Sequence, residues 1–316
     1  MNPYVLASVR PPVVTPVRTP DVIMWLESLD GSQRVDLSSG PVRWRADATG
    51  LGVPPVEVLT GTSPGMAGAT VEDVYTTERD VLLPVTVGGR NWVETWGAIE
   101  RLREITDPTN GVGPDGNFRL VAASPNGTRH LDLTYRGGLE DDGQPSQVRQ
   151  NRVLDLVAVM PFAQEPTEED AEFRLISTPR PFLSASTGTS RPWGTLAITA
   201  SGRLNGATPV DLLSAVPLFP TLEIVGPGTS VLLVGSNGLR IEVPLGLASD
   251  ETMRIVTDPR RPSIRVNGVL AAGRVALGSR YEPFGKGTTT ITATIPGATA
   301  ATRLRMTWRG LHRGLW

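Results

Sequence analysis

The chain contains no cysteine, a single lysine, few aromatic residues and no long apolar run. Without cysteine it can form neither a disulfide nor a thiolate metal site, and folding in the cytoplasm is compatible with this composition. Prolines and charges interrupt every stretch that could approach the roughly 18 apolar residues of a membrane-spanning helix. The first ten residues lack a basic segment followed by an apolar one, so we expect neither an export signal nor membrane insertion.

Positive charge is carried almost entirely by arginine, since Lys286 is the only lysine. This bias is typical of a GC-rich coding genome. Recognition of nucleic acid by arginines would require them to cluster on one face, whereas here they are dispersed along the chain. The net charge of −2 divides into −7 for residues 1–165 and +5 for residues 166–316. This difference favours two domains with these bounds.

The 316 residues include 34 glycines and 28 prolines spread along the chain, which is long enough for two hydrophobic cores. Many turns and few helical periods predict a mainly β protein. Expected strands of the first half are 22–29, 34–36, 81–87, 118–123, 129–135 and 153–160. Those of the second half, 222–225, 231–234, 239–243, 253–256, 264–266, 291–295 and 304–308, predict a β-sandwich. Tight turns are expected at Asp30-Gly31, Asn126-Gly127, Asn237-Gly238 and Asn267-Gly268.

One helix is expected, over residues 92–105. Asn91 is a suitable N-cap and Glu94 can complete a capping box. Asp107-Pro108 ends the helix. The apolar stripe expected to face a sheet consists of Trp92, Trp96, Ile99 and Leu102.

The remaining segments are expected to be irregular. Residues 1–20 form an extended arm, residues 50–70 a long loop rich in Gly, Pro and Thr, and residues 140–150 a polar loop. Residues 161–170 join the halves, with 166–170 as the best linker.

Residues 61–65 read Gly-Thr-Ser-Pro-Gly and match the pattern of a hydrolase nucleophile elbow around Ser63. In that motif the residue after the serine donates a backbone N–H to the oxyanion. Pro64 has no N–H, and residues 66–68 are a poor helix start. The string is therefore interpreted as a turn-rich loop.

No other pattern predicts chemistry. His130 and His312 are far apart in sequence, His130 falls at the solvent-facing phase of its strand, and both are expected at the surface. The acidic runs 140–142 and 168–170 lie in predicted loops and lack the ligand spacing of a calcium site. We expect no catalytic residue, no metal ligand and no cofactor. The sequence identifies no ligand-binding residue.

The tryptophans are the remaining candidates for a sugar-binding platform. Trp92 and Trp96 are expected in the helix stripe, and Trp308 is expected to face inward with Leu304 and Met306. Those left are Trp25, Trp44, Trp193 and Trp316, which form no evident cluster in sequence.

The order of elements resembles the tail-hub domain of siphophage distal tail proteins. In that family a strand of the form R-x-V-x-L-P precedes a helix rich in Trp and Leu and then Asp-Pro. Residues 79–84, Arg-Asp-Val-Leu-Leu-Pro, fit this pattern. The family's strand ending in Tyr, followed by Gly-Leu-Glu, is matched by residues 135–140, and its closing Pro-aromatic pair by residues 160–162.

The second half is similar to the galectin-like β-sandwich that follows in the same family. Residues 220–228 resemble its opening strand, and residues 253–261 resemble the strand before its hairpin. Residues 283–295 depart from the pattern, because Gly-Lys-Gly-Thr at 285–288 replaces a turn that contains asparagine. The resemblance covers about residues 20–310.

The resemblance implies a minor tail protein of the virion, not an enzyme. Its fold would be a tail-tube-like β-barrel or sandwich domain with one α-helix over residues 1–165, followed by a galectin-like β-sandwich over residues 166–316. It would form a homo-hexameric ring at the virion tail tip, assembled in the host cytoplasm. Implied partners are the tail tube protein, the tail-tip hub protein, the tape measure protein and receptor-binding proteins of the baseplate.

DNA is expected to pass through the ring without specific binding. Exposed basic residues would bind its phosphates, so part of the −7 charge is expected on the channel face. The alternative function is a carbohydrate-binding adhesion protein of the tail tip. A tail-associated hydrolase that acts through Ser63 is the third.

Overall fold

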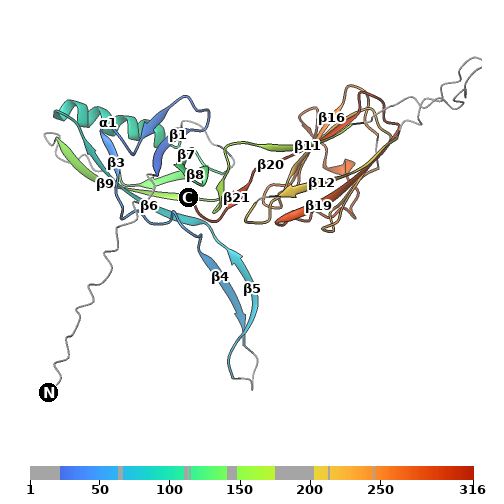
Figure 1. Ribbon diagram of the computed structural model, residues 1–316, viewed down its shortest axis with the longest axis horizontal. Coiled ribbons are helices and arrows are strands. Elements are labelled where there is room, and N and C mark those ends of the chain that lie inside the picture. The colour runs from blue at the N-terminus through green and yellow to red at the C-terminus, as the bar shows by residue number, and fades with distance from the viewer. Residues whose placement is uncertain are drawn as a thin grey trace, which may run out of the picture.

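The computed structural model describes residues 22–62, 67–109, 113, 115–140, 148–174, 203–212, 214–244 and 246–316. Over these residues the chain is mainly β with one α-helix, as expected from the sequence. Figure 1 shows two bodies, and a narrow ribbon of two strands that projects from the first. The expected extended arm at residues 1–20 lies outside the described residues.

The first body is built on a nine-stranded sheet that is nearly closed into a barrel. Its strands are β1 (Ile23–Ser28), β2 (Arg34–Asp36), β3 (Val42–Trp44), β6 (Arg79–Gly88), β7 (Phe118–Ser124), β8 (Gly127–Gly137), β9 (Arg149–Ala158), β10 (Ala163–Gln164) and β21 (Leu311–His312). The main path runs β2-β1-β7-β8-β9-β6-β3, and β10 joins β8 to β21. The turns predicted at Asp30-Gly31 and Asn126-Gly127 are confirmed, since they join the antiparallel pairs β1–β2 and β7–β8.

One face of this sheet is covered by α1 (Trp92–Thr106). Val81, Leu83, Val85 and Val87 alternate along β6 and are fully buried, as their spacing predicts. Ile99 and Leu102 of the helix belong to the same hydrophobic cluster. The first core therefore lies between the helix and the concave face of the sheet.

The predicted N-cap of α1 is confirmed. The Asn91 side-chain oxygen accepts a hydrogen bond from the Glu94 backbone N–H at 2.9 Å. The Glu94 carboxylate accepts one from the backbone N–H of Arg90 at 2.8 Å, one residue before the position that a capping box would use. The first contact satisfies a backbone donor that the first helical turn leaves without a partner, and the second ties the residue before the cap to the helix.

The predicted apolar stripe of the helix is wrong at Trp92. Its side chain is 54% exposed, and Trp96 is only half-buried, with the Arg103 guanidinium 5.4 Å from its ring centroid. The small side chains of Thr95 and Ala98 face the sheet instead. This lets the helix backbone lie close to the sheet and leaves the large indole rings outside the contact.

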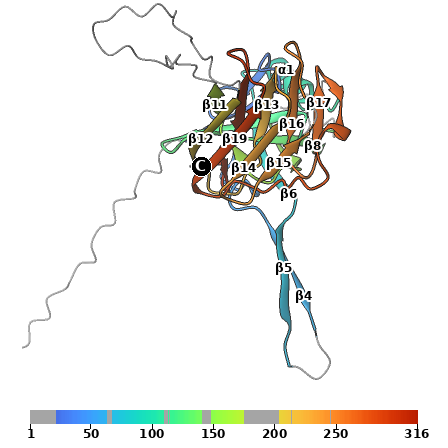
Figure 2. The ribbon, with the colours of Figure 1, turned by 90° about the vertical axis from the view of Figure 1, so that its right-hand side faces the viewer.

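The loop predicted over residues 50–70 is also wrong. Val56–Gly61 (β4) and Thr70–Thr76 (β5) pair with each other as an antiparallel ribbon. Figures 1 and 2 show this ribbon extending away from both bodies. Glycine, proline and threonine around the strands indicated a loop, but the β-branched residues within 56–60 and 70–76 favour extended backbone.

The second body is a β-sandwich, as predicted, with a core shared by two sheets. Its elements are β11 (Glu169–Arg174), β12 (Arg203–Leu212), β13 (Thr221–Val225), β14 (Val231–Gly235), β15 (Arg240–Val243), β16 (Thr252–Val256), β17 (Ser263–Val266), β18 (Val269–Leu270), η1 (Ala272–Arg274), β19 (Gly287–Pro296) and β20 (Arg303–Trp308). The order of the first sheet is β11-β20-β13-β16-β17-β18 and that of the second is β12-β19-β14-β15. Leu304, Met306 and Trp308 of β20 are buried, so their predicted inward phase is confirmed.

The turn at Asn267-Gly268 shows why these residue types mark a hairpin. Asn267 has φ +49° and Gly268 has φ +82°, which is the left-handed pair that a two-residue connection between β17 and β18 requires. The turn predicted at Asn237-Gly238 likewise joins β14 and β15.

The segment predicted as the linker is shorter than expected. β10 lies within it, and Glu169 and Asp170 already belong to β11, so residues 165–168 alone separate the two strands. After β20 the chain returns to the first body, where β21 pairs with β10 and Leu315 is fully buried in the first core. The polypeptide therefore passes between the bodies twice.

Arg79, the first residue of β6, holds this returning segment in place. Its side chain is 1% exposed, and its guanidinium donates hydrogen bonds to the carbonyls of Gly50 at 3.3 Å and Arg313 at 2.6 Å. Burial lowers the pKa of Arg79 to about 10, so the group remains charged at neutral pH. The arginine that carries the family resemblance thus fastens the end of the chain to the first body.

Candidate functional site

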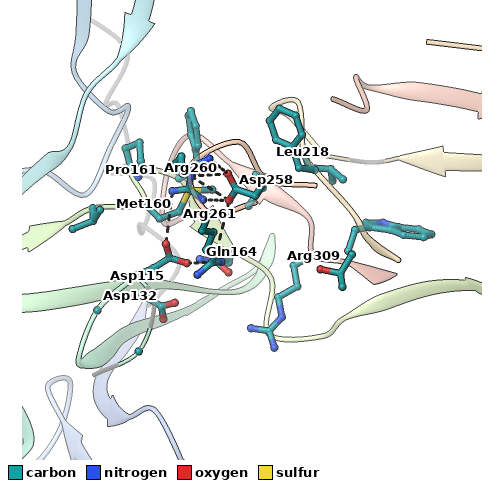
Figure 3. A pocket seen from close by; sticks show the side chains of 18 of the residues that line it. Asp115, Asp132, Met160, Pro161, Gln164, Leu218, Asp258, Arg260, Arg261 and Arg309 are labelled. Atoms are coloured by element: carbon teal, nitrogen blue, oxygen red, sulfur yellow. Dashed lines mark hydrogen bonds and ion pairs between the residues drawn. The ribbon is translucent and has the colours of Figure 1, made fainter. Parts of the chain in front are cut away.

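A cavity of about 700 Å³ lies where the two bodies meet. Gln164 of β10 and Met160, shortly before that strand, line it together with Leu218 and Arg309 of the second body, as Figure 3 shows. Carboxylates and guanidinium groups from both bodies converge on it. No local pattern in the sequence indicates this cavity, because its walls come from segments far apart in the chain.

Two arginines join the bodies across this cavity. Asp115, just before β7, is 8% exposed and forms an ion pair with Arg261 at 3.0 Å and a longer one with Arg260 at 3.7 Å. Asp258, which follows β16, binds Arg260 at 2.6 Å. Burial by itself would raise the pKa of Asp258, but its hydrogen bonds from Arg260 keep that pKa below its ordinary value.

A second charged cluster lies beside the cavity, around His130. Its side chain is 2% exposed, so the prediction of a surface histidine is wrong. The predicted phase was correct, since the neighbouring Leu131 faces the core. However, Gln164 of β10 pairs with His130, so the chain leaving β9 covers that face of the strand. Burial, followed by the charges of Arg119 and Arg309, lowers the pKa of His130 to about 4.

Asp132 faces the same cluster. It accepts a hydrogen bond from Arg119 at 3.1 Å and lies 3.8 Å from the His130 ring nitrogen Nε2, which has no hydrogen-bond partner. Burial raises the pKa of Asp132, and the charge of Arg119 opposes that shift. The cluster therefore consists of the neutral His130 imidazole beside the Asp132 carboxylate, which Arg119 binds.

The ion pairs of this cavity attach the two bodies to each other. Among the described residues that line the cavity there is no serine, cysteine, lysine or histidine. The carboxylates of Asp115 and Asp258 are engaged by arginines. In the part of the chain that the structure describes, no three acidic or histidine side chains gather as metal ligands would.

The remaining sequence candidates are placed separately from the cavity. Gly61 is the last residue of β4, and Ser63 and Pro64 of the serine string lie outside the described residues. His312 is partly buried and hydrogen-bonds Glu165 at 2.8 Å. None of the described helices is long and apolar enough to cross a membrane.

The acidic runs are less loop-like than predicted. Glu169 and Asp170 belong to β11, where the Glu169 carboxylate accepts a hydrogen bond from the Trp308 indole at 2.8 Å. Glu140 accepts hydrogen bonds from the Tyr135 hydroxyl and the Gly138 backbone N–H. Asp141 and Asp142 lie outside the described residues.

The other tryptophans serve local packing. Trp44 and Trp316 approach each other, with ring centroids 6.5 Å apart, and bring the end of the chain against β3. The Arg34 guanidinium lies 4.1 Å from the Trp25 ring centroid. Trp193 lies outside the described residues.

The sheet face opposite α1 is the other surface of interest. Leu82 and Val153 are 43% and 50% exposed there. Arg136 points to the same face and forms ion pairs with Asp80 at 2.6 Å and Glu78 at 3.2 Å. Two carboxylates thus surround the arginine on this part of the face.

Comparison with known proteins shows similarity in structure alone. No family model and no curated protein matches the sequence. The fold is similar to that of the Dit protein (gp 19.1) of phage SPP1, described as a paradigm of the hub adsorption apparatus in phages that infect Gram-positive bacteria. The TM-score is 0.57, with 16% identity over 90% of this chain and 98% of that chain.

A chain of the phage P2 baseplate, in its activated conformation with Ca, is also similar. Here the TM-score is 0.50, with 12% identity over 91% of this chain and 98% of that chain. At such identities the likeness concerns the fold. The resemblance expected from the sequence is confirmed at that level, and the chain has the fold of a phage distal tail (Dit) protein.

Proposed function

We propose that the protein is a structural component of a phage tail tip. The observation that carries this proposal is the extent of the likeness to SPP1 Dit, which spans 90% of this chain and 98% of that one. At this coverage the likeness extends over both bodies. The protein is not an enzyme in this proposal, and it acts at the virion tail tip after assembly in the host cytoplasm.

In the proposed assembly six copies form a ring that joins the tail tube protein to the tail-tip hub protein and meets the tape measure protein. Residues 1–165 form the ring, and the sandwich of residues 166–316 projects outward, except for the last residues of the chain, which return to the first body. Receptor-binding proteins dock on the sandwich, whose net charge of +5 contrasts with −7 for the ring domain.

DNA passes along the sheet face opposite α1. On the part of this face next to the start of β6, Glu78 and Asp80 neutralise Arg136, which suits a sliding polyanion. Free guanidinium groups in the channel would bind phosphates by releasing counterions and would slow the DNA.

The ring is tested by light scattering and negative-stain imaging of the purified full chain. The expected result is a six-fold particle with an open centre. A chain that stays monomeric in solution and also fails to form rings when mixed with its tube protein would contradict the proposal.

The channel face is tested with the ring itself. Glu78→Gln together with Asp80→Asn frees Arg136, so retention of double-stranded DNA at low salt should increase about tenfold or more. Asp250→Asn removes an exposed acid of the second body and serves as the matched control. Equal retention by both variants, or strong retention by the unmodified ring, would refute the assignment of this face.

The alternative is a carbohydrate-binding adhesion protein. Half-exposed Trp44 beside Trp316, 43% exposed, is the one aromatic pair among the described residues that could present rings to a sugar. Glycan-array binding by the full chain that is lost in Trp316→Ala would favour this function over the hub.

A further inference from the structure

Residues 311–316, which we call the strap, run from the second body into the first. Leu311 belongs to the hydrophobic core of the second body, where its backbone N–H donates to the Ser214 hydroxyl at 3.1 Å. Its carbonyl accepts a hydrogen bond from the Ala215 backbone N–H at 2.9 Å. Leu315 is fully buried in the core of the first body. Figure 1 shows β20 and β21 between the two bodies and the C-terminal end on the first, so the strap has one end in each core.

The strap binds the first body through its own backbone. Three hydrogen bonds join consecutive strap residues to distant segments: from Arg79 to the Arg313 carbonyl at 2.6 Å, from Arg129 to the Gly314 carbonyl at 3.3 Å, and from the Leu315 N–H to the Leu51 carbonyl at 3.1 Å. These contacts come in addition to the pairing of β21 with β10. The strap is therefore an integral part of the first body, although the sandwich precedes it in the chain.

The first body is incomplete without the strap. Among the described residues the buried Arg79 guanidinium has two hydrogen-bond partners, the carbonyls of Gly50 and Arg313, and its Nε has none. Removing the strap leaves this group with a single acceptor and empties the space that Leu315 fills. A buried charge that loses its partner and a cavity in a core both destabilise a fold.

The folded sandwich places the strap beside its binding site. Glu169, at the start of β11, lies opposite Trp308 at the end of β20, and the Glu165 N–H donates to the Gly310 carbonyl at 3.0 Å. The two crossings between the bodies are thus held side by side. With the sandwich unfolded, residues 165–310 become a flexible loop whose ends must meet before the strap can bind. For about 150 residues this closure is on the order of a thousandfold less favourable than for neighbouring residues.

We propose that the strap couples the folding of the two bodies, so that the first body is completed only when the sandwich is folded. The sandwich holds the strap in position, and the strap supplies an acceptor for Arg79 and a side chain for the first core. In the proposed ring this coupling excludes chains whose sandwich is unfolded. That consequence rests on the proposed ring, whereas the coupling itself is a property of the single chain.

Hydrogen exchange followed by mass spectrometry tests the coupling in the full chain. Ile224→Asp places a charge in the second core, where Ile224 is 0% exposed, and changes no residue of the strap or of the first body. Amide exchange in the strap should become at least about a hundredfold faster as the sandwich unfolds. Val234→Asp is the matched control, because this residue of β14 is 40% exposed, and strap exchange should not change. A strap that stays protected while the sandwich amides exchange freely would overturn the coupling.

The reverse experiment starts from the strap. Leu315→Asp keeps the strap out of the first core, because an aspartate there would be a buried charge without a partner. Coupling between two sites is reciprocal, so amide exchange in β13 and β16 of the sandwich should become at least about tenfold faster. Val153→Asp, at a position of the first body that is 50% exposed, is the control and should leave the sandwich unchanged. Unchanged sandwich exchange in Leu315→Asp would overturn the inference, even if the first body unfolds.

The outcomes separate the coupling from the proposed function. Unchanged exchange in both experiments overturns the coupling and leaves the hub function standing. Coupled exchange in a chain that forms no ring, alone or with its tube protein, supports the coupling and contradicts the ring.

Discussion

Strands β5 and β6 follow each other in the chain and carry similar residues, yet their environments are opposite. Val85 and Val87 of β6 are 0% exposed, whereas Val71 and Val74 of β5 are 57% and 55% exposed. α1 and the other sheet strands cover β6, while β5 has only β4 beside it. Alternating valines therefore predict a strand, but they do not show whether another segment of the chain buries their side chains.

The largest expected effect concerns the covered strand. Leu83→Ala leaves a cavity in the first core, and the free energy of unfolding should fall by about 2–5 kcal/mol. Urea denaturation followed by tryptophan fluorescence measures the loss. Leu82→Ala, next to it but 43% exposed, is the matched control and should cost well under about 1 kcal/mol. Equal losses would contradict the assigned faces of β6.

The pH dependence of stability tests whether β10 buries His130 on the opposite face of the same sheet. The folded pKa of His130, about 4, lies below its ordinary value of 6.5. As the pH falls, the His130 ring is therefore protonated in the unfolded chain before it is protonated in the folded one. Stability from this group is complete above pH 6.5 and is lost as the pH falls towards 4, by at most about 3 kcal/mol.

His130→Gln should flatten unfolding stability between pH 6.5 and 4. His312→Gln is the control, because it replaces the other histidine of the chain, which lies on β21. A slope that survives His130→Gln unchanged would show that the imidazole is not held neutral.

The helix that covers β6 provides a smaller effect. Asn91→Ala removes the side-chain oxygen that accepts from the Glu94 backbone, and stability should fall by about 1 kcal/mol. Asn91→Asp keeps an acceptor there and should restore most of it. Thermal unfolding monitored by circular dichroism measures both. No change in either variant would mean that water satisfies this helix end equally well.

The smallest effect on folding is expected on the uncovered strand. Val58→Ser with Val74→Ser changes side chains that the chain itself leaves half-exposed, so the unfolding free energy of the monomer should change by about 0.5 kcal/mol or less. Urea denaturation of the double variant measures this change. A large loss of monomer stability would show that the ribbon is covered within its own chain.

Local signals were sufficient for most of the elements. The cap at Asn91, the turn at Asn267-Gly268 and the alternation in β6 and β20 depend on neighbours in sequence, and each was found where predicted. The candidate site could not be predicted in this way. Asp115 and Arg261 meet across the two bodies, and His130 is buried by a strand that the sequence indicated to be linker.

The sequence by itself determined that this protein is mainly β, that it has one capped helix and two cores, and that its halves carry opposite charge. Periodicity, turn chemistry and capping act over a few residues, so they can be read along the chain. Only the tertiary structure decided which faces are covered, because burial depends on segments that are distant in sequence. It buried His130, exposed Trp92 and extended the β4–β5 ribbon into solvent.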